Sequence, residues 1–130
     1  MSNAIQYPVT PESAGRTSMP LPYSLATQVG NLIFASGQAS TDENGTIISA
    51  TFEEEFHRTM ANLRRVLVAA GSDLDKVVQV RSYVRDPANV GLYNELYREY
   101  FKEPLPARTT LTSCLPDNLH FEIECIAVTG

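Results

Sequence analysis

Two stretches of the chain place apolar residues at the spacing of an α-helix. In the first, from residue 52 to residue 70, apolar positions recur every three or four residues. They are Phe52, Phe56, Met60, Leu63, Leu67 and Ala70. Thr51 and Glu54 form a capping box at its start, and Gly71 is a typical residue just past a helix end. The pattern predicts an amphipathic helix over residues 52–70.

The second helical stretch follows Asp86-Pro87, a polar cap with a proline at the first helical position. Its predicted buried side consists of Val90, Tyr93, Leu96, Tyr97, Tyr100 and Phe101. Pro104 and Pro106 end this segment, because proline cannot continue a helix. The pattern predicts a second, shorter helix.

Alternation of apolar and polar residues predicts strands after each helix. In residues 77–84, Val78, Val80 and Val84 are expected on one face. Another strand is expected over residues 108–113. In residues 120–128, four apolar residues alternate with acidic ones; the apolar set is Phe121, Ile123, Cys125 and Ala127.

Two turn signals precede the first helix. Gly30-Asn31 separates residues 24–29 from residues 32–36, and Asn44-Gly45 favours a hairpin because both residues tolerate a positive φ. The predicted order is therefore strand, strand, strand, helix, strand, helix, strand, strand. This order indicates one α+β domain over residues 1–130, with two helices on one face of a mixed, mostly antiparallel sheet.

The pattern also predicts an N-terminal arm and an uncovered sheet face. Residues 1–22 contain Pro8, Pro11, Pro20 and Pro22, so we expect an extended arm lying over the surface. The sheet face away from the helices still carries Val, Ile and Leu side chains. Because monomers rarely expose large apolar patches, we expect this face to be buried against other copies of the chain.

Composition and charge narrow the classes of protein. Hydrophobic residues make up 43% and charged residues 19% of the chain, as in ordinary globular proteins. The longest apolar run, residues 66–70, is too short to span a membrane. The net charge of −5 and the single adjacent basic pair, Arg64-Arg65, argue against nucleic-acid binding. Cys114 and Cys125 lack metal or redox spacing, so both are expected to be buried in a reducing compartment, the cytoplasm.

Few residues stand out as candidates for chemistry. His57 and His120 lie far apart with no carboxylate or thiol at ligand spacing, so no metal site is expected and His57 is expected on the surface. Arg108 enters a strand directly after Pro106-Ala107. Its planar fork of donors suits a substrate carboxylate, and a surface ion pair is the alternative.

Acidic and small residues give further candidates. Glu122 and Glu124 share one face of the last strand: a partly buried one becomes a candidate acid or base, whereas two exposed ones form a solvated face. Ser36-Gly37 marks either a close approach of a ligand to the backbone or a plain bulge. Tyr23 and Asn94 offer polar contacts, or are an exposed aromatic and an exposed amide.

Taken together, these segments resemble the Rid (YjgF) family of reactive-intermediate deaminases over residues 22–128. The resemblance rests on the order and spacing of seven blocks: Pro22-Tyr23-Ser24, Ala35-Ser36-Gly37-Gln38, Asn44-Gly45, Ala69-Ala70-Gly71-Ser72, Tyr93-Asn94-Glu95-Leu96-Tyr97, Pro106-Ala107-Arg108 and Glu122-Ile123-Glu124-Cys125-Ile126-Ala127. It implies a chorismate-mutase-like (ferredoxin-like) α+β fold and a homotrimer with a cleft between each pair of neighbouring subunits.

The resemblance also implies an activity and a set of site residues. The family hydrolyses 2-imino acids and enamines, such as those released by pyridoxal-phosphate dehydratases, to 2-keto acids and ammonia without a metal or organic cofactor. Arg108 would bind the substrate carboxylate, and Glu122 would place water and move protons. Cleft-lining positions are Tyr23, Ser36, Gly37, Asn94 and Thr110, the last standing where members often have cysteine.

Three other functions stay open at this stage. Relatives have been described as endoribonucleases that inhibit translation, although the acidic charge argues against RNA binding. A non-catalytic trimer could use Arg108 to bind a carboxylate metabolite. A pathway-specific deaminase is the third, and the sequence does not separate it from a housekeeping enzyme. Leu21, Leu25 and the long arm depart from the family pattern at the cleft mouth, which leaves the choice of substrate open.

Overall fold

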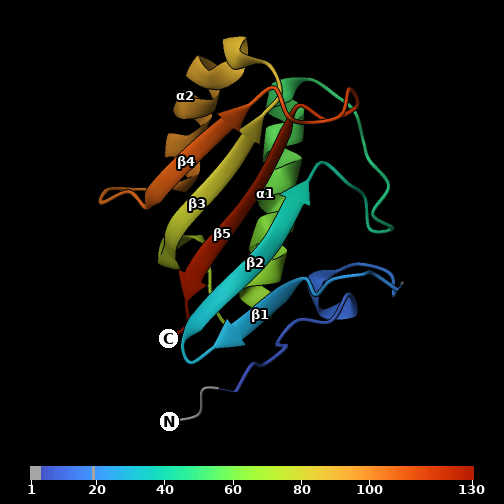
Figure 1. Cartoon of the computed structure of the whole chain (residues 1–130), viewed down its shortest axis with the longest axis vertical. Coiled ribbons are helices and arrows are strands. Elements are labelled where there is room, and N and C mark those ends of the chain that lie inside the picture. Colours follow the sequence, from blue (N-terminus) through green and yellow to red (C-terminus); the bar gives the residue numbers. More distant parts are fainter. Residues whose placement is uncertain (1–3, 19) are drawn as a thin grey trace.

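A five-stranded sheet forms the centre of the protein (Figure 1). In the computed structural model, which describes residues 4–18 and 20–130, the strands are β1 (Ala26–Val29), β2 (Leu32–Ala39), β3 (Val77–Val84), β4 (Ala107–Thr112) and β5 (Phe121–Val128). Their order in the sheet is β1-β2-β5-β3-β4. β3 and β4 run parallel, and the other neighbouring pairs run antiparallel. The predicted mixed, mostly antiparallel sheet is confirmed.

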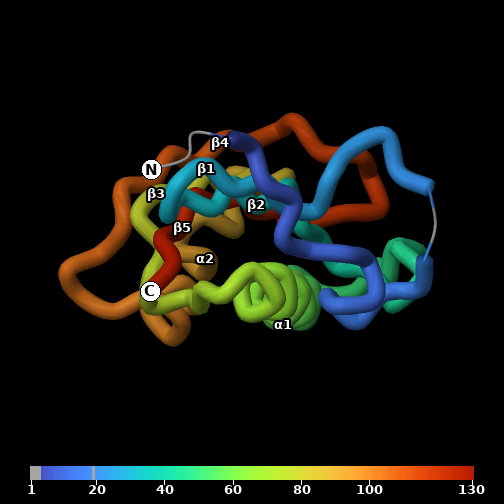
Figure 2. Tube along the Cα trace, turned by 90° about the horizontal axis from the view of Figure 1, so that it is seen from below, coloured from blue at the N-terminus to red at the C-terminus, as the bar shows by residue number. Residues whose placement is uncertain are grey.

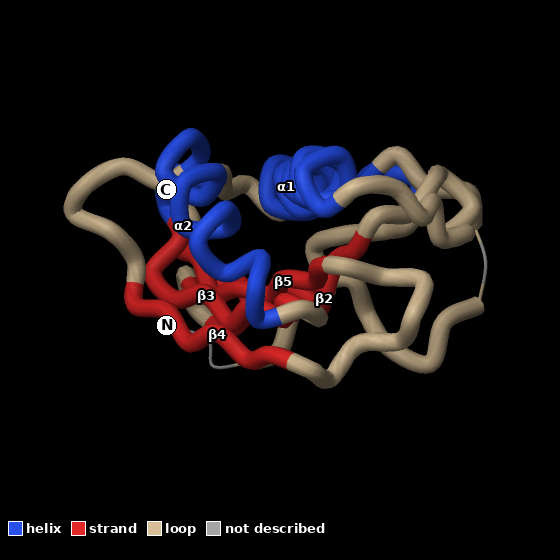
Figure 3. The backbone as a smooth tube through the Cα atoms, turned by 90° about the horizontal axis from the view of Figure 1, so that it is seen from above, coloured by secondary structure: helices blue, strands red, loops and turns tan. Residues whose placement is uncertain are grey.

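Two α-helices, α1 (Phe52–Ala69) and α2 (Val90–Tyr100), lie on one face of the sheet, as predicted (Figure 3). Thr51 caps α1, since its Oγ1 accepts the backbone N–H of Glu54 at 3.2 Å. Asp86 caps the short 3-10 helix Pro87–Asn89, which leads directly into α2. None of the helices in the described residues is long and apolar enough to cross a membrane.

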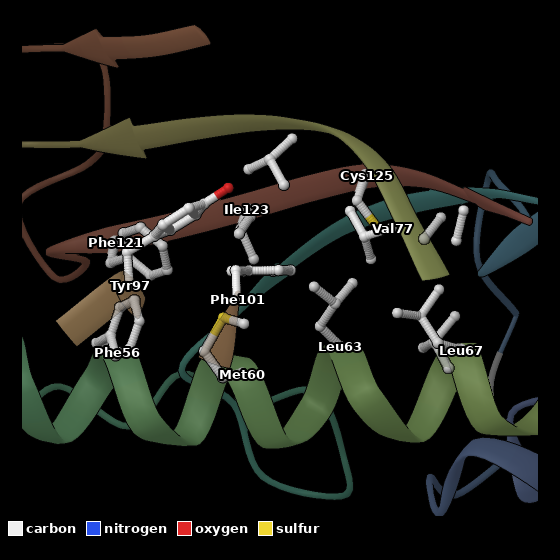
Figure 4. Packing of buried hydrophobic residues seen from close by; sticks show 14 of the residues in the cluster. Phe56, Met60, Leu63, Leu67, Val77, Tyr97, Phe101, Phe121, Ile123 and Cys125 are labelled. Carbon is white, nitrogen blue, oxygen red and sulfur yellow. The ribbon is translucent and has the colours of Figure 1, made fainter. Parts of the chain in front are cut away.

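The hydrophobic core fills the space between the helices and the sheet (Figure 4). Its fully buried members include Phe56, Met60, Leu63, Leu67, Val80, Tyr93, Phe121 and Ile123. The Phe56 ring lies 5.1 Å from the Phe121 ring and 5.9 Å from the Tyr93 ring, so an aromatic cluster joins α1, α2 and β5. Burying a side chain of this size stabilises the fold by about 1.5–3 kcal/mol.

The predicted third strand after Asn44-Gly45 is absent from the described part of the chain. The turn itself forms, with Gly45 at φ 78°, but Asp42 Oδ1 accepts the backbone N–H groups of Asn44 and Thr46. A single isolated bridge, between Thr41 and Ile47, remains of the expected hairpin. The side chain of Asp42 therefore closes the turn on itself, and the chain leaves toward α1 before a strand can form.

The predicted orientation of Val78 is also wrong. β3 carries a bulge between Val77 and Gln79 where it pairs with β5. Val77, Val80 and Val84 are buried, whereas Val78 is 45% exposed. One extra residue in a strand moves the following side chains to the other face, and the alternation rule cannot anticipate it.

The predictions for Cys114 and for the N-terminal arm need correction. Cys125 is buried as expected, but Cys114, in the loop after β4, is exposed. The N-terminal arm is more structured than an extended segment: Gln6 bridges to Gln28 of β1, and residues Glu12–Ala14 form a 3-10 helix beside α1 (Figure 2). The part of this prediction that falls on residues 1–3 and 19 lies outside the described residues.

Candidate active site

Arg108 lies near the start of β4 and projects toward α2. It is the register partner of Val80, which is fully buried on the helix side of the sheet. Its Nη2 donates a hydrogen bond to Asn94 Oδ1 at 2.7 Å. Within the described residues no carboxylate lies at ion-pair distance from Arg108. Arg108 therefore does not form the surface ion pair that was the alternative, as far as the described residues show. Its remaining N–H donors are available to bind a ligand.

A hollow of about 270 Å³ adjoins this arginine. It is lined by Asn94, Tyr97, Arg98, Leu105, Pro106 and Arg108. Thr110 lies two residues further along β4, opposite the buried Ser82. Thr110 Oγ1 is buried and has no hydrogen-bond partner among the residues that the structure describes. Of the predicted site residues, the fold thus brings Arg108, Asn94 and Thr110 to the α2 side of the sheet.

Glu122 lies on the opposite face of the sheet. Its neighbours Phe121 and Ile123 point into the core, so Glu122 and Glu124 face away from the helices, as predicted. Partial burial, and secondarily the charge of Glu124, raises the pKa of Glu122. Glu124 is compensated: it accepts a hydrogen bond from Tyr83 Oη at 2.6 Å and pairs with Arg81 at 3.2 Å. Glu122 is consequently a candidate acid or base.

Gly37 makes room for the Glu122 carboxylate. β2 carries a bulge between Ala35 and Gln38, where it pairs with β5. A Cβ atom on Gly37 would lie 2.9 Å from Glu122 Oε2 and 3.3 Å from its Cδ. The predicted bulge at Ser36-Gly37 is confirmed, and it sets the glycine beside the Glu122 carboxylate; the close approach of a ligand to this backbone stays a prediction.

Ser36 and Tyr23 lie further from these two groups. Ser36 Oγ donates to the carbonyl oxygen of Ser24 at 2.5 Å, and its backbone N–H donates to that of Leu25 at 2.9 Å. Ser36 thus ties β2 to the segment that follows Tyr23. Tyr23 is 52% exposed and makes no hydrogen bond within the described part of the chain. The structure does not bring Tyr23 into contact with Arg108 or Glu122.

Glu55 of α1 and His120, which precedes β5, form a hydrogen-bonded pair that was not predicted from the sequence. Glu55 is 0% exposed; its Oε1 accepts the His120 backbone N–H at 2.8 Å, and its Oε2 accepts the Ala50 N–H at 3.0 Å. Nδ1 of the His120 ring lies 2.8 Å from Glu55 Oε2. The sequence did hold a signal, because positions 55, 59 and 63 follow one another at helical spacing on the buried side of α1.

Replacing Glu55 by alanine is expected to lower the free energy of unfolding by about 3 kcal/mol, because it removes a fully buried carboxylate and leaves the partly buried donors of Ala50 and His120 without this partner. Urea unfolding measures the change. Glu53→Ala is the matched control: Glu53 lies in the same turn but is exposed, so its loss should cost less than about 0.5 kcal/mol. Equal losses in the two variants would contradict a structural role for Glu55.

The described residues contain no group of three or more His, Cys, Asp or Glu side chains arranged to hold a metal ion. His57 is not a plain surface residue: it is half-buried, and its Nδ1 lies 2.5 Å from Tyr100 Oη. The site residues are therefore an arginine with a polar hollow on one face and a half-buried carboxylate on the other. Together with the fold, they define a small α+β protein with candidate groups for anion binding and proton transfer.

Known proteins match this chain closely in sequence. Residues 16–129 match the family model described as Endoribonuclease L-PSP. A RutC family protein of Pyrococcus abyssi is 41% identical over 108 residues, which cover 82% of this chain and 85% of the relative. A 2-iminobutanoate/2-iminopropanoate deaminase of Mus musculus is 39% identical over 111 residues, covering 84% of this chain and 82% of the relative.

Solved structures match it as well. The crystal structure of YyfA from Yersinia pestis, a protein of unknown function of the conserved Rid family, superposes with a TM-score of 0.85 at 30% identity and covers 97% of this chain and 100% of its own. RidA from an Antarctic Psychrobacter has a TM-score of 0.81 at 27% identity, covering 95% and 98%. The chain belongs to the YjgF/Rid family.

Proposed function

We propose that this protein hydrolyses 2-imino acids, and the enamines that tautomerise to them, to 2-keto acids and ammonia. The observation that carries the proposal is the unpaired guanidinium of Arg108, held by Asn94 beside an open hollow. Such a group is suited to a planar carboxylate, which every 2-imino acid has. Relatives named 2-iminobutanoate/2-iminopropanoate deaminase, at 32–39% identity, support the choice of reaction.

In the proposed reaction, two side chains carry the hydrolysis of the imine. Arg108 binds the substrate carboxylate and orients the adjacent C=N carbon. Glu122 accepts a proton as water adds to that carbon, the imine nitrogen gains a proton, and a carbinolamine forms. The C–N bond then breaks, ammonia leaves, and the hydroxyl loses its proton to give the keto acid. Because the pKa of Glu122 is raised, it can both accept and return protons closer to neutral pH.

A homotrimer with sites between its subunits is part of the proposal. Arg108 and Glu122 project from opposite faces of one sheet, so a single small substrate reaches both more readily if they come from neighbouring copies. The open face also carries apolar side chains that water would otherwise cover, among them Leu32, Phe34 and Leu111, each 38–40% exposed. We also propose that the protein is located in the cytoplasm.

Phe34→Glu is expected to dissociate the oligomer, because it puts a charge into the buried centre of an apolar interface. Sedimentation equilibrium should give three times the chain mass for the unaltered protein and one chain mass for the variant. Val68→Glu is the matched control, since Val68 is 54% exposed on α1, on the far side of the sheet. A monomeric unaltered protein would contradict the trimer.

Gly37→Ala is expected to lower turnover by about tenfold or more, because its Cβ would push the Glu122 carboxylate out of position. Steady-state kinetics on the imine measures this loss, and circular dichroism checks that the fold is kept. Gly91→Ala serves as control, because nothing lies within 4 Å of a Cβ at that position of α2. Full activity in Gly37→Ala would remove Glu122 from the reaction.

A coupled assay tests the function itself. A pyridoxal-phosphate-dependent threonine dehydratase generates the enamine from serine or threonine, and keto-acid release is followed with and without this protein. Acceleration that disappears in Arg108→Ala would support both the reaction and the carboxylate anchor. No acceleration, with the oligomer intact, would favour a carboxylate-binding protein or a pathway-specific deaminase with another substrate.

Endoribonuclease activity is the second candidate, because the matching family model carries that description. The net charge of −5 makes it the weaker one, since RNA binding depends on cationic contacts. Cleavage of RNA by nuclease-free preparations, lost in Arg108→Ala, would favour it.

A further inference from the structure

The guanidinium of Arg108 rests on two tyrosine rings of α2. Its Cζ lies 4.8 Å from the centroid of the Tyr93 ring and 4.8 Å from that of the Tyr97 ring. The two residues are four apart in the helix, so both rings stand on the side of α2 that faces the sheet. Tyr93 is 0% and Tyr97 4% exposed. The guanidinium of Arg108 therefore contacts two buried aromatic rings and also borders the hollow beside α2.

Tyr93 is the more firmly held of the two rings. Its hydroxyl hydrogen-bonds to Ser82 Oγ, a fully buried group of β3. Its ring packs at 5.1 Å against Phe121 and at 5.9 Å against Phe56. The hydroxyl of Tyr97, by contrast, is buried and has no hydrogen-bond partner in the structure. Contacts from α1, β3 and β5 thus fix Tyr93 beneath Arg108.

We propose that Tyr93 is a positioning residue for substrate binding: its ring fixes the plane and reach of the Arg108 guanidinium toward the substrate carboxylate. This inference rests on the proposed function. A cation–π contact holds the guanidinium without using its N–H groups as donors to an acceptor atom, so these groups stay free for a bidentate contact. Asn94 takes one N–H of Nη2, so the others stay available. An arginine held in this way loses less side-chain entropy when the ligand binds.

Variants at position 93 separate the ring from the rest of the side chain. Tyr93→Leu, and Tyr93→Met as a second variant of similar bulk, should raise the KM for the imine and the Kd for 2-oxobutanoate by about tenfold, with a much smaller change in kcat. Tyr93→Phe keeps the ring and should stay within about threefold of the unaltered protein in both constants. Steady-state kinetics gives KM, and isothermal titration calorimetry gives Kd.

Leu96→Ala is the control for a purely structural effect. Leu96 is buried on the same helix, and among the described residues it is not one of those that line the hollow beside Arg108. Its replacement should lower the melting temperature without changing KM or Kd. An unchanged Kd in both ring-deleting variants, or the same rise in Leu96→Ala, would overturn the positioning role.

Failure of the proposed function has a different signature. An unaltered protein that binds 2-oxobutanoate without hydrolysing imines would refute the deaminase, while the Kd series would still decide the role of Tyr93. An unaltered protein that neither binds the keto acid nor turns over the imine would overturn both.

Discussion

Arg108→Lys is expected to lower kcat/KM for a 2-imino acid by about a hundredfold, while the oligomer persists. Lysine keeps the positive charge but presents it as a point, so the paired N–H groups that match a carboxylate are lost. The shorter, compact ammonium group also cannot contact Tyr93 and Tyr97 as the guanidinium does while one of its protons reaches Asn94. The coupled dehydratase assay measures the loss, and sedimentation checks the assembly.

The matched control is Arg64→Lys. Arg64 lies on the outer side of α1 and forms an exposed ion pair with Asp73 at 3.0 Å, so this exchange should leave kcat/KM unchanged. Near-normal turnover in Arg108→Lys would show that charge alone suffices and would refute the bidentate contact. Loss of the oligomer in that variant would instead assign Arg108 to the subunit interface.

The helices were predictable because their signals are local. Thr51, the repeating apolar positions and Gly71 all lie within one stretch of chain, and each fixes its own part of the backbone. The alternation in β5 was equally reliable, since Phe121 and Ile123 are fully buried and Glu122 is not. Local periodicity thus identified both α-helices and the buried face of β5.

The features that escaped prediction depend on contacts between distant segments. The bulge that exposes Val78 exists in relation to β5, and Asp42 suppresses the third strand by competing for N–H groups across a turn. Glu55 meets His120 across 65 residues of sequence. The pattern of residue types along the chain does not show which distant segments come into contact.

Some features of the candidate site were likewise predictable from the sequence and others were not. Arg108 and Glu122 were identifiable as residue types at strand positions, but their placement on opposite faces follows from the parallel pairing of β4 with β3. The contact between Arg108 and Asn94, and the space that Gly37 leaves for Glu122, likewise needed the folded chain. The sequence could therefore nominate the residues for the chemistry, whereas their contacts and their positions relative to one another came from the structure.

Glu122→Gln is expected to lower kcat by about 10²–10³-fold and to leave the Kd for 2-oxobutanoate nearly unchanged, because the amide keeps the shape of the side chain but cannot accept a proton. Stopped-flow or steady-state kinetics measures kcat, and calorimetry measures Kd. An unchanged kcat would move the proton-transfer role to Glu124 or to the backbone.

Glu122→Gln, which is expected to lower kcat, should also raise the thermal stability of the protein at pH 7. Because burial raises the pKa of Glu122, the folded protein still holds this proton at pH values where the unfolded chain has lost it. Stability therefore falls as the pH rises from the unfolded to the folded pKa, and the carboxylate remains a cost above that interval. Glutamine resembles the protonated form and avoids this cost. The melting temperature of Glu122→Gln should exceed that of the unaltered protein at pH 7 and match it near pH 4.

Glu124→Gln separates this effect from a general loss of negative charge. Glu124 pairs with Arg81 and accepts a hydrogen bond from Tyr83, so its neutralisation removes favourable contacts and should lower the melting temperature at pH 7. Opposite signs at two carboxylates on one strand face would mean that Glu122 is held in an environment that disfavours its charge. Such an environment gives a proton carrier its catalytic use. A decrease in both variants would instead mean that Glu122 is an ordinary solvated carboxylate.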